Sequence, residues 1–241
     1  MRISRRFQAF FALVIMAHIV VWIYARPLQA EWRNVPPAPS QFSVQAAGMG
    51  DTQLSYRLIG FMLQNIGKVG GRTESLASYD YQKLQKWFFA GYDLDPQAAF
   101  IPMLATYYYG GTSKPDQARA VAEFLEVAGN NPYKDRWRWL VHAIYLAQHK
   151  VGDLNLALKL ADILGKIPNQ NMPPWTRQMK AMVLNSKGDK QDAYILMKTM
   201  LETSADTMEP TEVNQTIAYI CEQILTPEEA THDPVCKLKK P

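Results

Sequence analysis

A spacing of 36 residues recurs through the middle of this 241-residue chain. The positions that keep it are Pro96, Pro132 and Pro168; Gly152-Asp153 and Gly188-Asp189; Phe88, Phe124, Leu160 and Leu196; and Gln85, Val121, Ala157 and Ala193. A fixed period of this length is typical of stacked repeat proteins, in which each unit buries its apolar face only against its neighbours. We therefore expect a chain that holds a partner rather than one that converts a substrate.

The apolar pattern after Asp51 is helical throughout. In the first predicted helix, apolar residues recur at spacings of three and four, as one helix face requires; they are Leu54, Leu58, Phe61, Met62 and Ile66. Further helices are expected near residues 79–93, 98–109, 115–129, 134–150, 153–166, 174–187, 189–203 and 210–225. The glycine-rich segment 67–78 predicts a long loop, and no strand alternation is found, so the expected fold class is all-α.

The paired helices resemble the tetratricopeptide repeat. In that family the second helix carries a small residue and, four positions later, an apolar one, and a proline closes the repeat. Ala120, Phe124 and Pro132 match this pattern, and the likeness covers about residues 52–205. The resemblance implies a solenoid of about four antiparallel helix pairs. The period of 36 exceeds the family's usual 34, so a different α-solenoid or a plain helical bundle is the alternative.

The positive charge of the chain is concentrated at its N-terminus. The sequence holds 26 Lys and Arg against 22 Asp and Glu, and the first thirty residues contain Arg2, Arg5, Arg6 and Arg26 as their only charged residues. The rest of the chain is therefore balanced and offers no basic field for a phosphate backbone. We expect no nucleic-acid partner.

A basic tail at residues 1–6 precedes an apolar stretch at residues 7–25, which is long enough to span a membrane. Cleaved signal peptides have shorter apolar stretches, so we favour an uncleaved signal-anchor. Three arginines before the span place the N-terminus in the cytoplasm and the rest in the periplasm of a bacterial inner-membrane protein. A cleaved signal peptide with an exported soluble domain is the first alternative, and a mitochondrial membrane location is the second.

The rest of the chain divides into three predicted parts. Residues 26–50 include a proline-rich run that predicts a semi-rigid linker, residues 51–226 form the helical domain, and residues 227–241 form a tail. Cys221 and Cys236 flank the last boundary and would join the tail to the last helix by a disulfide in an oxidising compartment. Two unrelated thiols are the alternative.

The sequence offers no recognisable catalytic or metal-binding pattern. His142 and His149 lie seven residues apart, about 10.5 Å along a helix, which is too far for both to bind one metal ion without other ligands. No nucleophile, phosphate-binding or dinucleotide motif is present. We therefore expect no enzyme activity, no cofactor and no metal.

The resemblance implies that the first helix of each pair lines a groove for partner peptides. Carried over by the 36-residue spacing, the partner-binding residues would be Thr106, His142, Gln178, His149, Asn185 and the adjacent Lys150. Such polar side chains can bond an extended peptide backbone, although plain solvated surface is the equal alternative. Met103, Trp139 and Trp175 form a third column that is either an apolar wall or, as we favour for the tryptophans, inter-repeat core.

These observations predict a membrane-anchored scaffold that binds protein partners, themselves membrane-associated, in a cell-envelope complex. Anchoring raises the effective concentration of the domain for such partners. A structural subunit of a membrane assembly that uses its convex face is the first alternative. An enzyme or a solute-binding protein is the less favoured one.

Overall fold

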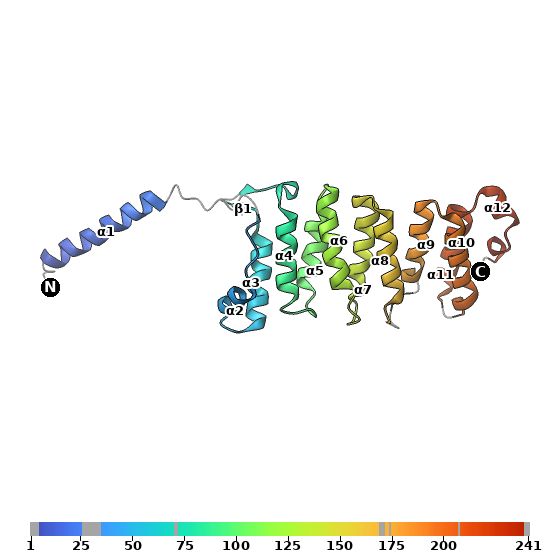
Figure 1. Ribbon diagram of the computed structural model, residues 1–241, viewed down its shortest axis with the longest axis horizontal. Helices are drawn as coiled ribbons and strands as arrows, with labels where there is room; N and C mark the ends of the chain where they lie inside the picture. The colour runs from blue at the N-terminus through green and yellow to red at the C-terminus, as the bar shows by residue number, and fades with distance from the viewer. Residues whose placement is uncertain are drawn as a thin grey trace.

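The computed structural model describes residues 5–25, 35–69, 72–168, 172–173, 175–206 and 208–238. Beyond a separate N-terminal helix, the helices stand side by side in chain order and form an elongated row (Figure 1). The expected all-helical class is confirmed, apart from one hairpin of two-residue strands. The bounds of the helices in the row are α3 Thr52–Asn65, α4 Tyr81–Tyr92, α5 Phe100–Tyr107, α6 Pro115–Gly129, α7 Trp137–Tyr145, α8 Leu154–Lys166, α9 Trp175–Lys187, α10 Lys190–Ser204 and α11 Pro210–Tyr219.

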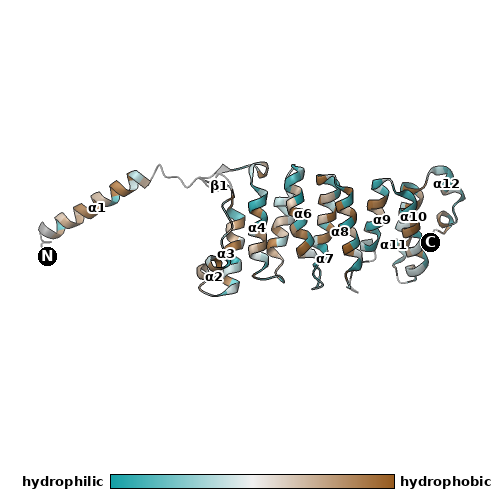
Figure 2. Ribbon diagram, in the orientation of Figure 1, coloured by the Kyte–Doolittle hydropathy of each residue, from teal (hydrophilic) through white to brown (hydrophobic). Residues whose placement is uncertain are grey.

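Helix α1 (Arg5–Ala25) lies apart from the row, and the described side chains Phe7–Ala25 are exposed. Its apolar segment Phe7–Ala25 is long and apolar enough to span a membrane. Figure 2 shows hydrophobic residues along most of α1, whereas the helices of the row carry both hydrophilic and hydrophobic residues. The predicted linker residues 26–34 lie outside the described residues.

Aspartates and glycines fix where the helices of the row begin and end. Asp51, Asp80 and Asp153 are N-caps whose carboxylates accept hydrogen bonds from backbone N–H groups in the first turns of α3, α4 and α8. Gly152 and Gly188 have positive φ angles of 75° and 95°, which a glycine adopts without steric cost. Gly152-Asp153 is therefore a stop signal followed by a start signal, whereas Asp189 is the N-cap of α10 without a side-chain capping bond.

Side-chain hydrogen bonds between the helix pairs follow the repeat period. Residues 34 to 39 positions apart are joined, as in Arg119–Asp153, Gln148–Ser186, Gln178–Thr216 and Tyr194–Asp233. Helices also contact their sequence neighbours, as α6 contacts α7 and α8 contacts α9. Each unit is therefore held by the units beside it.

The core runs along the row in two adjoining clusters. The first contains buried residues from Val35 to Val183, and the second contains buried residues from Ala181 to Val235. Among the three consecutive tyrosines, Tyr109 is fully buried against Phe88 while Tyr107 is exposed. Consecutive side chains on a helix point in different directions, which accounts for this difference.

The N-terminal boundary of the folded domain lies earlier than the sequence predicted. Val35 and Val44 are buried in the first core cluster, and the indole Nε1 of Trp87 donates to the carbonyl of Pro36 at 2.9 Å. Helix α2 (Gln41–Ala47), which was not predicted, is capped by Ser40 and packs against α3. Residues 35–50 are therefore part of the domain and not a free spacer, because their apolar side chains find a place in its core.

Two further predictions in this region need correction. Leu58 and Phe61 lie on the exposed side of α3, which instead buries Tyr56, Ile59 and Leu63. The predicted loop 67–78 contains strands β1 (Lys68–Val69) and β2 (Arg72–Thr73), which pair antiparallel, and the short helix η1 (Leu76–Ser78). Strands of two residues are too short to show alternation in a sequence.

The C-terminal tail covers part of the far end of the row. Helices α7 and α11 each end in a π-helical turn, η3 (Leu146–Val151) and η4 (Ile220–Ile224). Beyond them, α12 (Pro227–His232) and η5 (Val235–Lys237) fold back, and a disulfide joins Cys221 in η4 to Cys236 in η5. The short 3₁₀ helix η2 (Tyr109–Gly111) completes the described elements.

Candidate functional site: the first-helix surface

Exposed aromatic side chains gather on the first helices of the successive pairs. Phe61 of α3 is 62% exposed, Tyr107 of α5 is 68% exposed and Tyr145 of α7 is 51% exposed. Helices α3, α5 and α7 lie in contact in that order. We give the name first-helix surface to a set of exposed side chains on these helices and on the π-helical turn that follows α7; they are Arg57, Phe61, Met103, Tyr107, Arg138, Tyr145 and His149.

Helix α7 and its π-helical turn contribute a continuous stripe to this surface. Arg138, His142, Tyr145 and His149 follow one another at spacings of four, three and four, which places them on one helix face. The rings of Tyr145 and His149 lie 5.0 Å apart. The stripe therefore combines a guanidinium, two imidazoles and a phenol along two to three turns.

His142 joins α7 to α5. Its Nε2 lies 3.2 Å from the hydroxyl oxygen of Tyr107, and the two rings meet edge to face with centroids 5.1 Å apart. The ring centroid of Trp139, a buried residue on the same helix, lies 6.4 Å from that of His142. Partial burial lowers the pKa of His142 below 6.5, so the imidazole is predominantly neutral at pH 7.

The predicted partner-binding residues divide into exposed and inward-facing sets. His149 is exposed and His142 is half-buried beside it. Gln178 is only 5% exposed, and its amide donates to the hydroxyl of Thr216 at 2.8 Å. The hydroxyl oxygen of Thr106 is also buried. Gln178 therefore serves a contact inside the row, whereas the buried Thr106 hydroxyl has no hydrogen-bond partner among the described residues.

Lys150 and Asn185 bridge neighbouring units. The ammonium group of Lys150 donates to the carbonyl of Thr112 at 3.0 Å. The amide of Asn185 donates to the hydroxyl of Tyr219 at 3.2 Å and lies 3.4 Å from the carbonyl of Gln223. Both side chains are half-buried, so their first role is to join the units.

The third predicted column is mixed in character. Trp139 is buried, as expected for inter-repeat core, whereas Trp175 and Met103 remain partly exposed. The ring centroids of Trp175 on α9 and Trp137 on α7 lie 5.9 Å apart. Trp175 therefore also joins two neighbouring helix pairs.

An asymmetry of charge distinguishes the first helices α3, α5, α7 and α9 from the second helices α6, α8 and α10. Within their described bounds, α3, α5, α7 with η3, and α9 contain no Asp or Glu, although they carry Arg57, Arg138, Lys150, Arg177, Lys180 and Lys187. The second helices α6, α8 and α10 carry Asp116, Glu123, Glu126, Asp162, Asp192 and Glu202. The contrast does not extend to the two ends of the row, because the second helix α4 contains no Asp or Glu and the first helix α11 contains Glu212. The overall balance of charge concealed this difference, which a separate count for each helix would have found.

The basic groups differ in how far neighbouring carboxylates neutralise them. Lys180 lies 2.7 Å from Asp162, and Lys187 lies 3.3 Å from Asp189. Arg138 is only 3.9 Å from an exposed carboxylate of Asp135. Such exposed pairs are weak, so Arg138 and the exposed Arg57 remain able to bind an external carboxylate.

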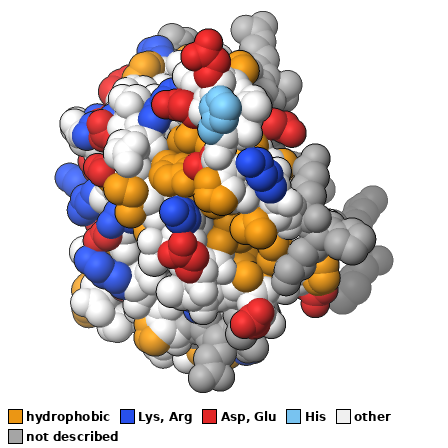
Figure 3. All heavy atoms as spheres, turned by 90° about the vertical axis from the view of Figure 1, so that its right-hand side faces the viewer, with side chains coloured by type: hydrophobic (Ala, Val, Ile, Leu, Met, Phe, Trp, Pro, Cys, Tyr) orange, Lys and Arg blue, Asp and Glu red, His pale blue; other side chains and the backbone are white. Residues whose placement is uncertain are grey.

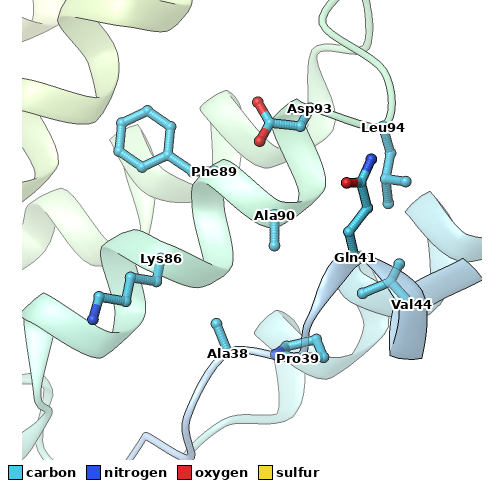
Figure 4. A pocket seen from close by; sticks show the side chains of 9 residues that line it. All are labelled: Ala38, Pro39, Gln41, Val44, Lys86, Phe89, Ala90, Asp93 and Leu94. Atoms are coloured by element: carbon cyan, nitrogen blue, oxygen red, sulfur yellow. The ribbon is translucent and has the colours of Figure 1, made fainter.

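A pocket of about 440 Å³ lies on the opposite, second-helix side at the N-terminal end of the row. Figure 4 shows it between the segment that carries Ala38, Pro39 and Val44 and the helix that carries Phe89 and Ala90. Lys86 and Asp93 are its charged lining residues. Its lining is mainly apolar, which suits an apolar segment better than a reacting polar group.

Titratable groups in the described chain are arranged for structure. No group of three His, Cys, Asp or Glu side chains that could hold a metal ion occurs among the described residues. Burial raises the pKa of Tyr79 to about 12 and raises those of Tyr81 and Tyr109 further. These phenols stay protonated at neutral pH and donate to backbone carbonyls, as Tyr79 does to Ile66 and Tyr81 to Tyr109.

Comparisons with models of known protein families, with curated proteins and with solved structures find no match to this chain.

Proposed function

We propose that this protein is a membrane-anchored scaffold whose first-helix surface binds an acidic segment of a partner protein. The observation that carries the proposal is the coincidence of exposed aromatic side chains with helices that contain no acidic residue. Aromatic and arginine side chains contribute most of the binding energy in protein interfaces. A surface that presents both favours a peptide with carboxylates and apolar side chains.

The aromatic side chains supply the apolar part of this interface. Tyr107 and Tyr145 present rigid rings with a hydroxyl at the tip, so they can pack on an apolar side chain and bond its backbone. The contact between His142 and the Tyr107 hydroxyl holds one of these rings in place before binding. A ring that is already ordered loses less conformational entropy when a partner binds.

The arginines supply the charged part. Arg57 and Phe61 lie one turn apart on α3, as Arg138 and His142 do on α7. Guanidinium groups bind carboxylates with two parallel hydrogen bonds, so they select acidic over neutral segments. The lack of acidic residues on these helices reduces the repulsion that such a partner would otherwise meet, although the exposed carboxylate of Asp135 lies beside Arg138.

We also infer that the helix pairs form a divergent tetratricopeptide-like solenoid, exported to the periplasm of a bacterial inner-membrane protein. Hydrogen bonds at separations of 34 to 39 residues support the stacked arrangement. The disulfide between Cys221 and Cys236 supports an oxidising compartment. The apolar helix α1 supports an anchor that keeps the scaffold beside a membrane-associated partner.

Photo-crosslinking of the full chain in cells tests the proposed function. A photoreactive amino acid replaces Tyr145 on the first-helix surface or, as a matched control, the exposed Val127 on α6. We expect a discrete protein adduct from Tyr145, identifiable by mass spectrometry, and little or none from Val127. Adducts from Val127 with none from Tyr145 would favour a structural subunit that uses its second helices.

A further inference from the structure

An apolar pocket opens at the C-terminal end of the row. It has a volume of about 300 Å³ and is lined by Leu201 and Ala205 of α10 and its C-terminus, Val213 and Ile217 of α11, Val235 and Leu238 of the tail, and Lys198 and Glu202. Figure 3 looks onto this end of the molecule and shows hydrophobic side chains gathered there with charged side chains around them. Leu238 is 60% exposed at its edge.

The pocket exists because the last helix pair is incomplete. The second helices α4, α6, α8 and α10 contain 12 to 15 residues, whereas α12 in the corresponding place contains 6. After α12 the chain turns through η5, which contacts α11 through a short segment only. Part of the apolar surface of α10 and α11 therefore lacks the covering that a full second helix would give.

The two charged side chains of the pocket have opposite signs and lie one turn apart on the same helix. Lys198 and Glu202 are separated by four residues on α10, so they occupy one helix face. The ammonium group of Lys198 lies over the ring of Tyr194, one turn earlier. Tyr194 in turn donates to Asp233 of the tail at 2.6 Å. The helix is thus fixed against the tail, with Lys198 and Glu202 at the rim.

We propose that this end of the molecule binds the same end of a second copy, giving a two-fold dimer through α10. When the two-fold axis is perpendicular to α10, the two α10 helices cross antiparallel, which brings Lys198 of each copy to Glu202 of the other. The pattern of charge is therefore self-complementary, as an isologous interface requires. The same pairing covers Leu201 with its counterpart and closes the pocket to water.

Two features of the chain favour this dimer. The disulfide between Cys221 and Cys236 fixes the segment that carries Val235 and Leu238, so one wall of the pocket is in place before the copies meet. Anchoring by α1 confines the copies to one membrane and raises their effective concentration. The dimer leaves the first-helix surface open, so it does not depend on the proposed partner binding.

Charge exchange tests the proposal with the full chain in detergent, by sedimentation equilibrium. The wild type is expected to form a reversible dimer. Lys198→Glu and Glu202→Lys should each weaken it about tenfold, because each replaces two attractive contacts by repulsive ones. In the double variant Lys198→Glu/Glu202→Lys, each contact again joins opposite charges, with the signs exchanged, so dimerisation should recover. The matched control Lys190→Glu, which changes the same charge eight residues earlier on α10, should leave the dimer unchanged.

The outcomes separate this dimer from other forms of association. A wild type that stays monomeric over the whole concentration range overturns the proposal and points to a different protein as the occupant of the pocket. A dimer that tolerates both single exchanges also overturns it, since association through α1 alone would behave in that way. Weakening in both single variants without recovery in the double variant contradicts the antiparallel pairing.

Discussion

Tyr107 and His142, 35 residues apart, meet at the boundary between two helix pairs, with 3.2 Å between the phenol oxygen and Nε2. Tyr107 is exposed and His142 is half-buried, so the contact links the surface of the row to its interior. It also places an ordered aromatic ring in the centre of the first-helix surface. A contact that stacks two units therefore also shapes the surface that we propose for partner binding.

The lowered pKa of His142 predicts a loss of stability in mild acid. Burial keeps the folded-state pKa below the unfolded value of 6.5, so the unfolded chain binds the proton more readily. Stability from this residue is complete above pH 6.5 and is lost as the pH falls through 6.5 towards the folded-state pKa. Thermal unfolding of the wild type and His142→Gln, compared between about pH 8 and pH 5, should show a smaller decrease in Tm for the variant. Equal decreases would show that His142 is not the responsible group.

Removal of the disulfide should destabilise the C-terminal end. The bond joins cysteines 15 residues apart, and a loop of that size contributes about 3 kcal/mol to the free energy of unfolding. We expect a decrease of this order for Cys221→Ser/Cys236→Ser in urea denaturation. A reductant should lower the free energy of unfolding of the wild type by the same amount and should not change that of the variant. A decrease in the variant as well would mean that the reductant acts on something other than this disulfide.

The buried contact between Gln178 and Thr216 should be energetically coupled. The Gln178 amide donates to the Thr216 hydroxyl, which itself donates to the carbonyl of Glu212 at 2.8 Å. A double-mutant cycle with Gln178→Ala and Thr216→Val is expected to give a coupling energy of about 1 kcal/mol. Additive effects of the two substitutions would mean that the two side chains do not interact in solution.

Loss of a buried hydroxyl should weaken the contact between α4 and η2. The phenol of Tyr81 donates to the carbonyl of Tyr109 at 2.8 Å in the core. Tyr81→Phe keeps the ring but leaves that carbonyl without this donor, at a cost of about 1–2 kcal/mol in unfolding free energy. Tyr145→Phe, at an exposed position, is the matched control and should change stability little. Equal stability of the two variants would contradict the role given to the Tyr81 hydroxyl.

Sequence patterns predicted the helices well because local signals determine their ends. The cap at Asp153 and the positive φ of Gly152 are encoded by the residues themselves, and α8 begins where the pattern indicated. Helix α2 was missed because it is held by long-range contacts, such as the burial of Val44 against the core. Prolines nearby suggested a spacer, although Pro36 supplies a carbonyl to Trp87.

The candidate site was predicted less completely, for a geometric reason. A first helix in a row contacts neighbours on more than one side, so a polar column can face either a neighbouring unit or solvent. The 36-residue spacing placed His142 and Gln178 in one column, yet His142 contacts Tyr107 near the surface and Gln178 is buried against Thr216. The exposed rings of Tyr107 and Tyr145 lay outside the columns chosen for the groove. Their exposure follows from packing, which spacing alone does not give.

The most direct test of the scaffold is the effect of charge reversal on crosslinking from position 145 in cells. Arg57→Glu/Arg138→Glu changes two exposed arginines of the first-helix surface and leaves its aromatic rings in place. We predict that this variant loses the protein adduct obtained from the photoreactive residue at position 145, while Lys190→Glu on α10 retains it. An adduct of undiminished yield in the arginine variant would contradict an acidic partner on this surface.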